Sequence, residues 1–403
     1  MRRRGLVMTT GLIGLCLITT LATVPACAQD VAPKTIKIGA MYDITGPLAS
    51  SGARFGWGLK KGIEAINKDG GLYVKEFNKK IPVELVEADH TAKEDKAVLQ
   101  AEYLNEQGIL ALIATTACLP TAAAVYERNH LPTLASLSSM EAPFNLGYKY
   151  LFSNFPKWSD LARTVITLFK SFSQKPTTIA LFEVQYDPGI EACKAAEKEA
   201  AANGFKTVRV KFGWLTKDMS GAILEAKKAG ADAVYSMAIL PDAMLMIKQM
   251  KELDYNPKAI FILEGPTNRS GWLTLGKDGD YVYTVNDWHW SMNFPGSKEL
   301  TALYEAEKKE KPYESSGDAY ACVQIIADAV KRAGALKREK IRDALAATDT
   351  MTVVGPTKFR PNGTMEIPYA TLVQYQNGVE TVVFPDRLKE KSPVYPVPLW
   401  KQR

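Results

Sequence analysis

The sequence predicts an α/β protein with two doubly wound, Rossmann-like lobes. Short apolar runs alternate with segments whose apolar residues recur at helical spacing, which is typical of parallel strands joined by helical crossovers. An aromatic segment that contains a proline, Tyr148–Trp158, interrupts this alternation, which then resumes. Each of the two series of strands and helices is long enough to form a sheet covered by helices on both faces, so we expect two lobes.

The first run predicts the sheet and helices of one lobe. Ile36–Met41 is the first expected strand, and the helical spacing of Phe55, Leu59, Ile63 and Ile66 indicates the helix that follows it. The later elements are, in order, strand Val83–Ala88, helix Lys93–Gln107, strand Ile109–Ala114, helix Thr121–Arg128 and strand Thr133–Leu137.

The second run repeats this order of elements. It consists of strand Thr178–Phe182, helix Glu191–Ala202, strand Val208–Phe212, helix Gly221–Ala229, strand Ala233–Met237, helix Ala243–Leu253 and strand Ala259–Leu263. A second aromatic segment, Val285–Pro295, then precedes two helices, Ser297–Lys309 and Gly317–Ala333.

The last part of the chain changes to a strand-and-turn pattern. Strands are expected at Val353–Phe359, Tyr369–Tyr375 and Thr381–Phe384, with Asn-Gly turns at residues 362–363 and 377–378. The end of the chain, Lys389–Arg403, is rich in proline and charge and is predicted as a surface tail.

Residues 1–28 have the pattern of a cleaved signal peptide. Three arginines precede an uncharged apolar stretch, and Ala26-Cys27-Ala28 provides the small residues that a signal peptidase requires. Lipid attachment at Cys27 is the less favoured alternative, because Pro25 is a poor residue for it. Both general secretion and twin-arginine export stay open, and no later stretch approaches 18 apolar residues.

Composition excludes several classes of protein. The chain is 46% hydrophobic and 23% charged, as in folded globular domains rather than disordered or fibrous chains. Its net charge of +6 falls to +3 once the three arginines of the signal are removed, which argues against a nucleic-acid partner. Three cysteines then remain, Cys118, Cys193 and Cys322, and we expect them to be buried small hydrophobes.

No pattern of catalytic, cofactor or metal-binding residues is evident. Gly56, Gly58 and Gly62 approach a dinucleotide fingerprint, but their spacing is wrong and they lie inside a helical pattern. The three histidines, His90, His130 and His289, are isolated from one another and from paired cysteines. We therefore expect no enzyme, cofactor or metal site. A secreted hydrolase would need a nucleophile or carboxylate pair that the sequence does not display.

Polar loops follow three of the predicted strands in the first run. They are Asp43–Gly52, Thr115–Thr121 and Ser136–Ser139, and all three contain hydroxyl side chains. In a doubly wound sheet, ligands bind at the carboxyl ends of the strands, where hydroxyls and helix N-termini favour an anion such as a carboxylate. Helix capping is the alternative explanation for each loop taken alone.

An ordered series of short motifs resembles one known family, the periplasmic branched-chain amino-acid-binding proteins, which are type I solute-binding components of ABC importers. The resemblance covers about Lys34–Phe384. The early motifs are Ile38-Gly39, Thr45-Gly46-Pro47, Ile66-Asn67, Gly70-Gly71 and Val86–Asp89. The later ones are Ala180–Tyr186, Ala231–Tyr235, Glu264–Asn268, Gly355–Phe359 and Asn362-Gly363.

The resemblance implies two lobes joined by three crossovers, with the ligand in the cleft between them. The first lobe would comprise residues 31–152 and 288–365, and the second residues 153–287 and 366–390, followed by a tail, 391–403. The partners it implies are a small solute and the permease and ATPase subunits of an importer, with the protein monomeric in the periplasm.

The same resemblance implies which residues bind the solute. Its carboxylate would meet the hydroxyl loops, its ammonium would meet Glu264, and Tyr186 would close over it. The full set of expected ligand-binding residues is Thr116, Ala117, Cys118, Ser136, Ser138, Ser139, Tyr186, Leu240 and Glu264.

Departures from the family pattern leave the solute open. Cys118 and the bulky Leu119 occupy the first binding loop, and Asp187-Pro188 follows the closing tyrosine. Trp288 and Trp290 either enlarge an apolar pocket or are structural residues of a hinge. An amino acid or small carboxylate is expected. The alternatives are an aromatic acid, an amide or urea-like solute, or a ligand-sensing receptor module.

Overall fold

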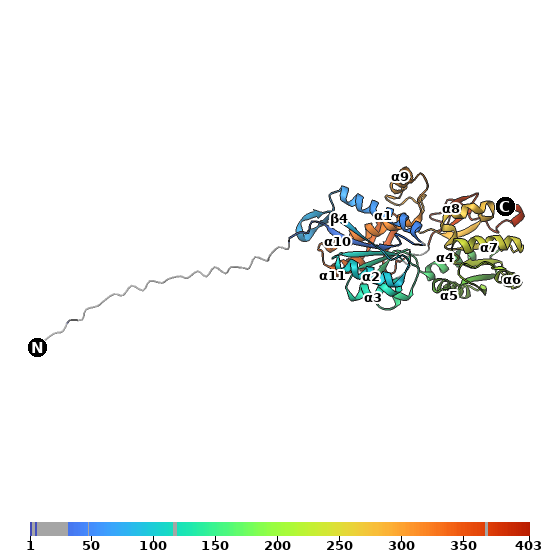
Figure 1. The fold of residues 1–403 in the computed structure, drawn as a ribbon, viewed down its shortest axis with the longest axis horizontal. Helices are drawn as coiled ribbons and strands as arrows, with labels where there is room; N and C mark the ends of the chain where they lie inside the picture. Colours follow the sequence, from blue (N-terminus) through green and yellow to red (C-terminus); the bar gives the residue numbers. More distant parts are fainter. Residues whose placement is uncertain (2–4, 6–30, 47, 116–118, 367–369) are drawn as a thin grey trace.

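The computed structural model describes residues 31–46, 48–115, 119–366 and 370–403, together with residues 1 and 5. Two lobes lie side by side along the long axis, each built on its own sheet (Figure 1). One sheet has the strand order β4-β1-β5-β6-β7 and the other β16-β15-β12-β11-β10-β8-β9. The prediction of an α/β fold with two parallel-sheet lobes is confirmed. The signal peptide, apart from residues 1 and 5, lies outside the described residues.

The first lobe has a five-stranded sheet in which every pairing is parallel. Its strands are β1 Ile36–Tyr42, β4 Val83–Asp89, β5 Ala111–Thr115, β6 Thr133–Ser136 and β7 Leu151–Ser153. The helices α1 Ala49–Lys68, α10 Glu314–Ala333 and α11 Arg338–Ala346 cover one face, and α2 Glu94–Glu106 and α3 Leu119–Arg128 cover the other. The apolar strands are thus buried on both sides, as their sequence predicts.

Smaller elements complete this lobe. A hairpin of β2 Leu72–Val74 and β3 Lys79–Ile81 follows α1, and α9 Ser297–Lys308 packs beside Trp57 of α1. The strand expected over Val353–Phe359 is instead a hairpin of β13 Asp349–Thr352 and β14 Gly355–Lys358. Gly355 has a φ of 107°, which a residue with a side chain rarely adopts and which lets the chain reverse there.

Glycines on α1 allow α10 to approach it closely. A Cβ built on Gly58 would lie 2.2 Å from the carbonyl oxygen of Ser316, and one built on Gly62 would lie 2.8 Å from Cβ of Val323. The glycine series that approaches a dinucleotide fingerprint is therefore a helix-packing surface.

The second lobe has a seven-stranded mixed sheet. Its parallel strands are β8 Thr178–Val184, β9 Lys206–Phe212, β10 Ala233–Ser236, β11 Ala259–Ile262 and β12 Val282–Val285. The strand β15 Leu372–Gln376 joins the sheet by pairing antiparallel with β12. The predicted turn at Asn377-Gly378, with positive φ at both residues, connects β15 to its antiparallel neighbour β16 Val379–Phe384. The helices are α4 Trp158–Ser171, α5 Asp187–Ala202, α6 Ser220–Lys228, α7 Leu240–Glu252 and α8 Arg269–Trp272.

The chain passes between the two lobes three times. It leaves the first lobe after β7, returns after β12, and leaves again between Met365 and Ala370, a segment that includes residues outside the described ones. The helix α4 and the strand β12 were not expected, because the aromatic segments beside them obscure their patterns. Trp288, which follows β12, is fully buried and donates from Nε1 to the Ser297 hydroxyl, so it is a structural residue there.

The C-terminal segment packs against the second lobe, where the C-terminus is marked in Figure 1. Trp400 is buried and donates from Nε1 to the carbonyl of Tyr255, and the Val397 amide donates to the carbonyl of Lys258. The Arg403 guanidinium lies 3.6 Å from the centroid of the Trp400 ring. Residues 391–403 therefore form a surface segment that the buried side chains of Val397 and Trp400 anchor to the second lobe.

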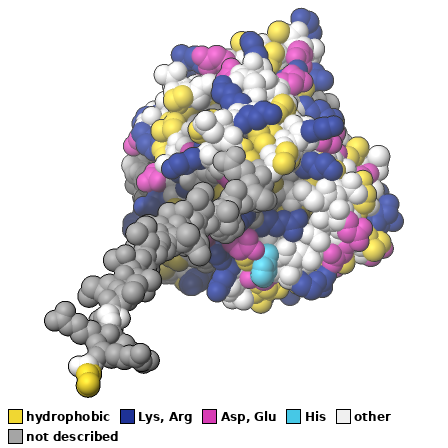
Figure 2. Space-filling model, turned by 90° about the vertical axis from the view of Figure 1, so that its left-hand side faces the viewer, with side chains coloured by type: hydrophobic (Ala, Val, Ile, Leu, Met, Phe, Trp, Pro, Cys, Tyr) yellow, Lys and Arg dark blue, Asp and Glu magenta, His cyan; other side chains and the backbone are white. Residues whose placement is uncertain are grey.

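Other expectations concern cysteines and surface charge. Cys193 and Cys322 are buried and unpaired, as predicted, while Cys118 lies outside the described residues. Figure 2 looks onto the end of the first lobe, where basic and acidic side chains are interspersed without a continuous basic stripe. Within the described ranges, no helix is long and apolar enough to cross a membrane.

Candidate functional site

The loop after β6 places three serines at the carboxyl end of the first sheet. Ser136 ends the strand, and Leu137 takes a φ of 54°, which turns the chain at once so that Ser138 and Ser139 follow. All three serines are buried. The hydroxyls of Ser136 and Ser138 have no hydrogen-bond partner in the described part of the chain. Buried hydroxyls are normally paired, so these two are available to a solute.

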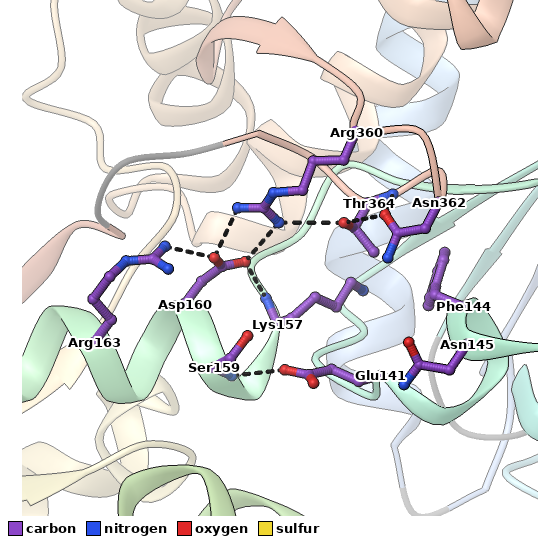
Figure 3. A pocket seen from close by; sticks show the side chains of 10 residues that line it. All are labelled: Glu141, Phe144, Asn145, Lys157, Ser159, Asp160, Arg163, Arg360, Asn362 and Thr364. Carbon is purple, nitrogen blue, oxygen red and sulfur yellow. Dashed lines mark hydrogen bonds and ion pairs between the residues drawn. The ribbon is translucent and has the colours of Figure 1, made fainter. Parts of the chain in front are cut away.

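The N-terminus of α4, where Lys157 and Ser159 lie near Glu141 (Figure 3), holds this loop in place. The amide of Trp158 donates to the carbonyl of Ser139, and the amide of Ser159 donates to Glu141 at 2.8 Å. The Lys157 ammonium donates to the carbonyl of Ser138 and, at 2.8 Å, to the hydroxyl of Ser153. Burial lowers the pKa of Lys157 to about 7. The hydroxyl loop is therefore fixed by the first crossover between the lobes.

Asp160 ties two of the crossovers together (Figure 3). Its buried carboxylate accepts from Arg163 at 2.6 Å, from Arg360 at 2.9 Å, and from the Lys157 amide at 3.1 Å. Arg360 lies on the segment that leads to the third crossover, whereas Asp160 is in the first turn of α4. A pocket of about 270 Å³ lies among these residues, at the hinge rather than at the strand ends.

We expect Asp160→Ala to lower the free energy of unfolding by about 2 kcal/mol in urea titrations. Removing one partner of a buried ion pair costs about 3–5 kcal/mol, and the partial exposure of the Arg163 and Arg360 side chains reduces that figure. Asp328→Ala is the matched control, because Asp328 pairs with Arg332 at a solvent-exposed site. Equal losses in both variants would contradict the assigned role of Asp160.

His90 supports the end of β5, just before the first hydroxyl loop. Its Nε2 lies 3.1 Å from the hydroxyl of Thr115, and its Nδ1 accepts from the amide of Ala92 at 3.1 Å. Burial lowers the pKa of His90 and raises that of the neighbouring Asp43 to about 6. Thr116, Ala117 and Cys118 come next along the chain and lie outside the described residues.

The second lobe contributes Tyr186 and Leu240. Tyr186 is half-buried at the start of α5, where its hydroxyl contacts Sδ of Met237 at 3.0 Å. Its ring meets that of Trp214 edge to face, with centroids 4.4 Å apart. Leu240 begins α7 and packs within the second lobe, since a Cβ on Gly271 would strike its side chain.

Glu264 follows β11 and begins a short 3-10 helix. Its side chain is exposed, yet the surrounding protein desolvates the carboxylate and raises its pKa. The negative charge of Glu264 also contributes to a raised pKa at Glu314, in the first turn of α10. Glu264 of the second lobe therefore lies within electrostatic reach of Glu314 on the first lobe.

Sequence reasoning missed three further acids beside this space. They are Asp287, which follows β12, and Glu314 and Asp318, one turn apart on α10. Burial raises the pKa of each one. No recognisable motif surrounds these three residues. The one feature of the sequence that could have indicated them is that each is an acidic residue in a largely apolar segment. Among the described residues, no group of His, Cys, Asp or Glu is arranged to hold a metal ion.

A comparison with family profiles identifies the chain. The family described as periplasmic binding protein matches residues 35–379. The chain belongs to the periplasmic binding protein family. Members of this family are solute-binding proteins and not enzymes, which agrees with the expectation from the sequence.

Curated relatives of this periplasmic binding protein align over nearly its whole length. Leu/Ile/Val-binding protein homolog 7 of Brucella suis biovar 1 (strain 1330) is 24% identical over 392 residues, covering 90% of this chain and 95% of the relative. Leu/Ile/Val-binding protein homolog 8 of Brucella abortus (strain 2308) is 26% identical over 400 residues, covering 93% and 94%.

Solved structures of periplasmic binding proteins share the fold. A leucine-binding protein from Thermotoga maritima superposes with a TM-score of 0.76 at 20% identity, covering 88% of this chain and 100% of its own. A solute-binding protein of an ABC transporter from R. palustris, in complex with benzoate, gives a TM-score of 0.72 at 16% identity, covering 87% and 95%. At these identities the likeness establishes the fold and leaves the solute open.

Proposed function

We propose that this chain is the periplasmic solute-binding component of an ABC importer, and that it captures an amino acid or a related small carboxylate. The observation that carries the proposal is the pair of buried hydroxyls without a hydrogen-bond partner, Ser136 and Ser138, on the first lobe. Glu264 of the second lobe supports it, because its charge acts on Glu314 of the first lobe. This arrangement suits a zwitterion, because hydroxyls accommodate its carboxylate and Glu264 its ammonium group. The names of the Brucella relatives support the same class of solute.

Each expected site residue has a role in this proposal. Ser136, Ser138 and Ser139, with Thr116, Ala117 and Cys118, form the carboxylate-binding side of the cleft. Tyr186 covers the solute when the lobes close, and Leu240 supports the second-lobe wall.

Closure of the lobes links capture to delivery. The moving units are residues 31–152 with 288–365 and residues 153–287 with 366–390, and the solute stabilises the closed form because it contacts both. The closed form then docks on a permease and its ATPase. One monomer carries one solute, after export and removal of residues 1–28.

An aromatic acid is the second candidate solute. Tyr186 and Trp214 form an aromatic pair at the carboxyl ends of β8 and β9, where the ring of an aryl acid could pack. The R. palustris protein of the same fold was solved in complex with benzoate.

Thermal unfolding with a panel of solutes tests the proposed function. We expect members of one solute class to raise the Tm, since a ligand at 1,000 times its Kd adds about 4 kcal/mol to the stability of the folded state. The panel should contain branched-chain, basic and aromatic amino acids, aryl acids, and amides. If no small solute raised the Tm, the capture function would be contradicted.

A further inference from the structure

Four carboxylates surround the proposed solute site, although a single ammonium group needs only one. Glu264 comes from the second lobe, Asp287 from the second crossover, and Glu314 and Asp318 from α10 of the first lobe. The charges of Asp318, Asp287 and Glu264 each act on Glu314, and the charge of Asp318 acts on Asp287. A Cβ built on Gly317 would lie 2.2 Å from the Trp288 ring, so the residues next to these two in the chain, Asp318 and Asp287, lie in the same region of the fold.

Two of these carboxylates lack hydrogen-bond partners. Asp318 is fully buried, and neither of its carboxylate oxygens has a partner in the described part of the chain. Oδ2 of Asp287 is also buried without one. An ionised carboxylate in the interior is costly unless it is paired, and the cost is several kcal/mol.

The cations near this group make their hydrogen bonds to other residues, although the charge of Lys157 acts to lower the pKa of Asp287. Arg269 binds Glu380 at 2.7 Å, and Arg360 binds Asp160. Lys157 donates to Ser138 and Ser153 and lies over the ring of Phe144. With its side-chain amide turned so that the nitrogen faces Glu314, Asn286 donates to Oε2 of Glu314 at 3.1 Å.

The unpartnered acids adjoin the serine loop. Asp318 precedes Cys322 by one helical turn on α10, and Cys322 lies beside Ser136. Ser136, whose hydroxyl adjoins the Cys322 thiol, and the unpartnered carboxylate of Asp318 therefore border the same interior region, so a solute held by the serines would lie within reach of the acids.

We infer that the solute of this protein carries a second positively charged nitrogen group, a protonated amine or a guanidinium, which is held by Asp287 and Asp318. Glu264 then binds the α-ammonium and the serine loop binds the carboxylate, so the class of solute is a basic amino acid or a close relative. The inference rests on the proposed capture function. An organic cation fits better than a metal ion, because the described acids do not form a metal-ligand group.

Calorimetric titration of the mature protein with matched pairs of solutes tests the inference. The pairs are L-arginine against L-citrulline, its neutral counterpart, and L-lysine against L-norleucine. We expect each basic member to bind at least about tenfold more tightly, as one extra charge-assisted contact of about 1.4 kcal/mol requires. Asp318→Asn and Asp287→Asn should each remove most of that preference. The control Asp349→Asn, at an exposed position in β13, should keep it.

A second measurement does not depend on how the variants fold. Titrations of the unmodified protein in two buffers of different ionisation enthalpy should detect proton release with arginine, because burial raises the pKa of Asp287 and Asp318 and a bound cation lowers it. Citrulline should release none. If a neutral amino acid bound and neither arginine nor lysine did, the inference would be overturned while the capture function stood. If no solute bound at all, the capture function itself would fail.

Discussion

Glu264→Ala is expected to weaken solute binding by about two orders of magnitude and to leave the stability of the solute-free protein within about 0.5 kcal/mol. Truncating one partner of a desolvated charge pair costs about 2–5 kcal/mol, because the other charge is left buried without a partner. The Glu264 side chain is exposed, and no hydrogen bond or ion pair of its carboxylate is seen among the described residues. Calorimetric titration measures the first quantity, and urea unfolding without solute measures the second.

The matched control for this prediction is Glu225→Ala. Glu225 is an exposed glutamate on α6 of the same lobe, away from the strand ends. Its loss changes the net charge by the same amount, so any general effect of charge on affinity would be visible in both variants. An affinity unchanged by Glu264→Ala would remove Glu264 from the site and would direct attention to the other acids beside the cleft.

The sequence was sufficient for the architecture because the signals that define it are local. The apolar run of β1 is bounded by polar residues, and the helical spacing after it sets the register of α1. Turn chemistry was equally local, as at Asn377-Gly378 between β15 and β16. The sequence was misleading at the C-terminal segment, which has no helical or strand periodicity and was interpreted from its proline and charge content alone. Trp400 lies in this charged, proline-rich segment and is buried against the second lobe, where its Nε1 donates to the carbonyl of Tyr255. Local sequence does not indicate a contact with a residue so distant in the chain.

The residues of the proposed site also differ in whether a local sequence signal indicates them. The position of the serine loop at the carboxyl end of β6 could be predicted, because a polar segment follows an apolar parallel strand there, and solute binding by this loop stays a prediction. The proximity of Asp287 and Asp318 could not be predicted, because one residue is in a crossover, the other is in the second turn of α10, and no sequence motif relates the two positions. Their proximity exists only once α10 has packed against α1 and the chain has returned to the first lobe.

Gly317→Ala is expected to lower the free energy of unfolding by about 3 kcal/mol. A Cβ built on Gly317 would lie 2.2 Å from Cδ2 of Trp288. The Trp288 ring is fully buried and its Nε1 is fixed by the Ser297 hydroxyl, so the ring has no space to move. Overpacking of this kind costs about 1–3 kcal/mol and sometimes more. Gly221→Ala, also in a helix, meets no atom within 4 Å and should be neutral or stabilising by up to about 1 kcal/mol.

The same substitution connects the hinge to the site. Trp288 directly follows Asp287, and Gly317 directly precedes Asp318, so the contact between the ring and the glycine sets the separation of the two acids. If these acids hold the solute, a Gly317→Ala protein that still folds at low temperature should bind its solute more weakly than the Gly221→Ala protein. Weakened stability with unchanged affinity would mean that the ring contact holds the lobes together without positioning Asp287 and Asp318.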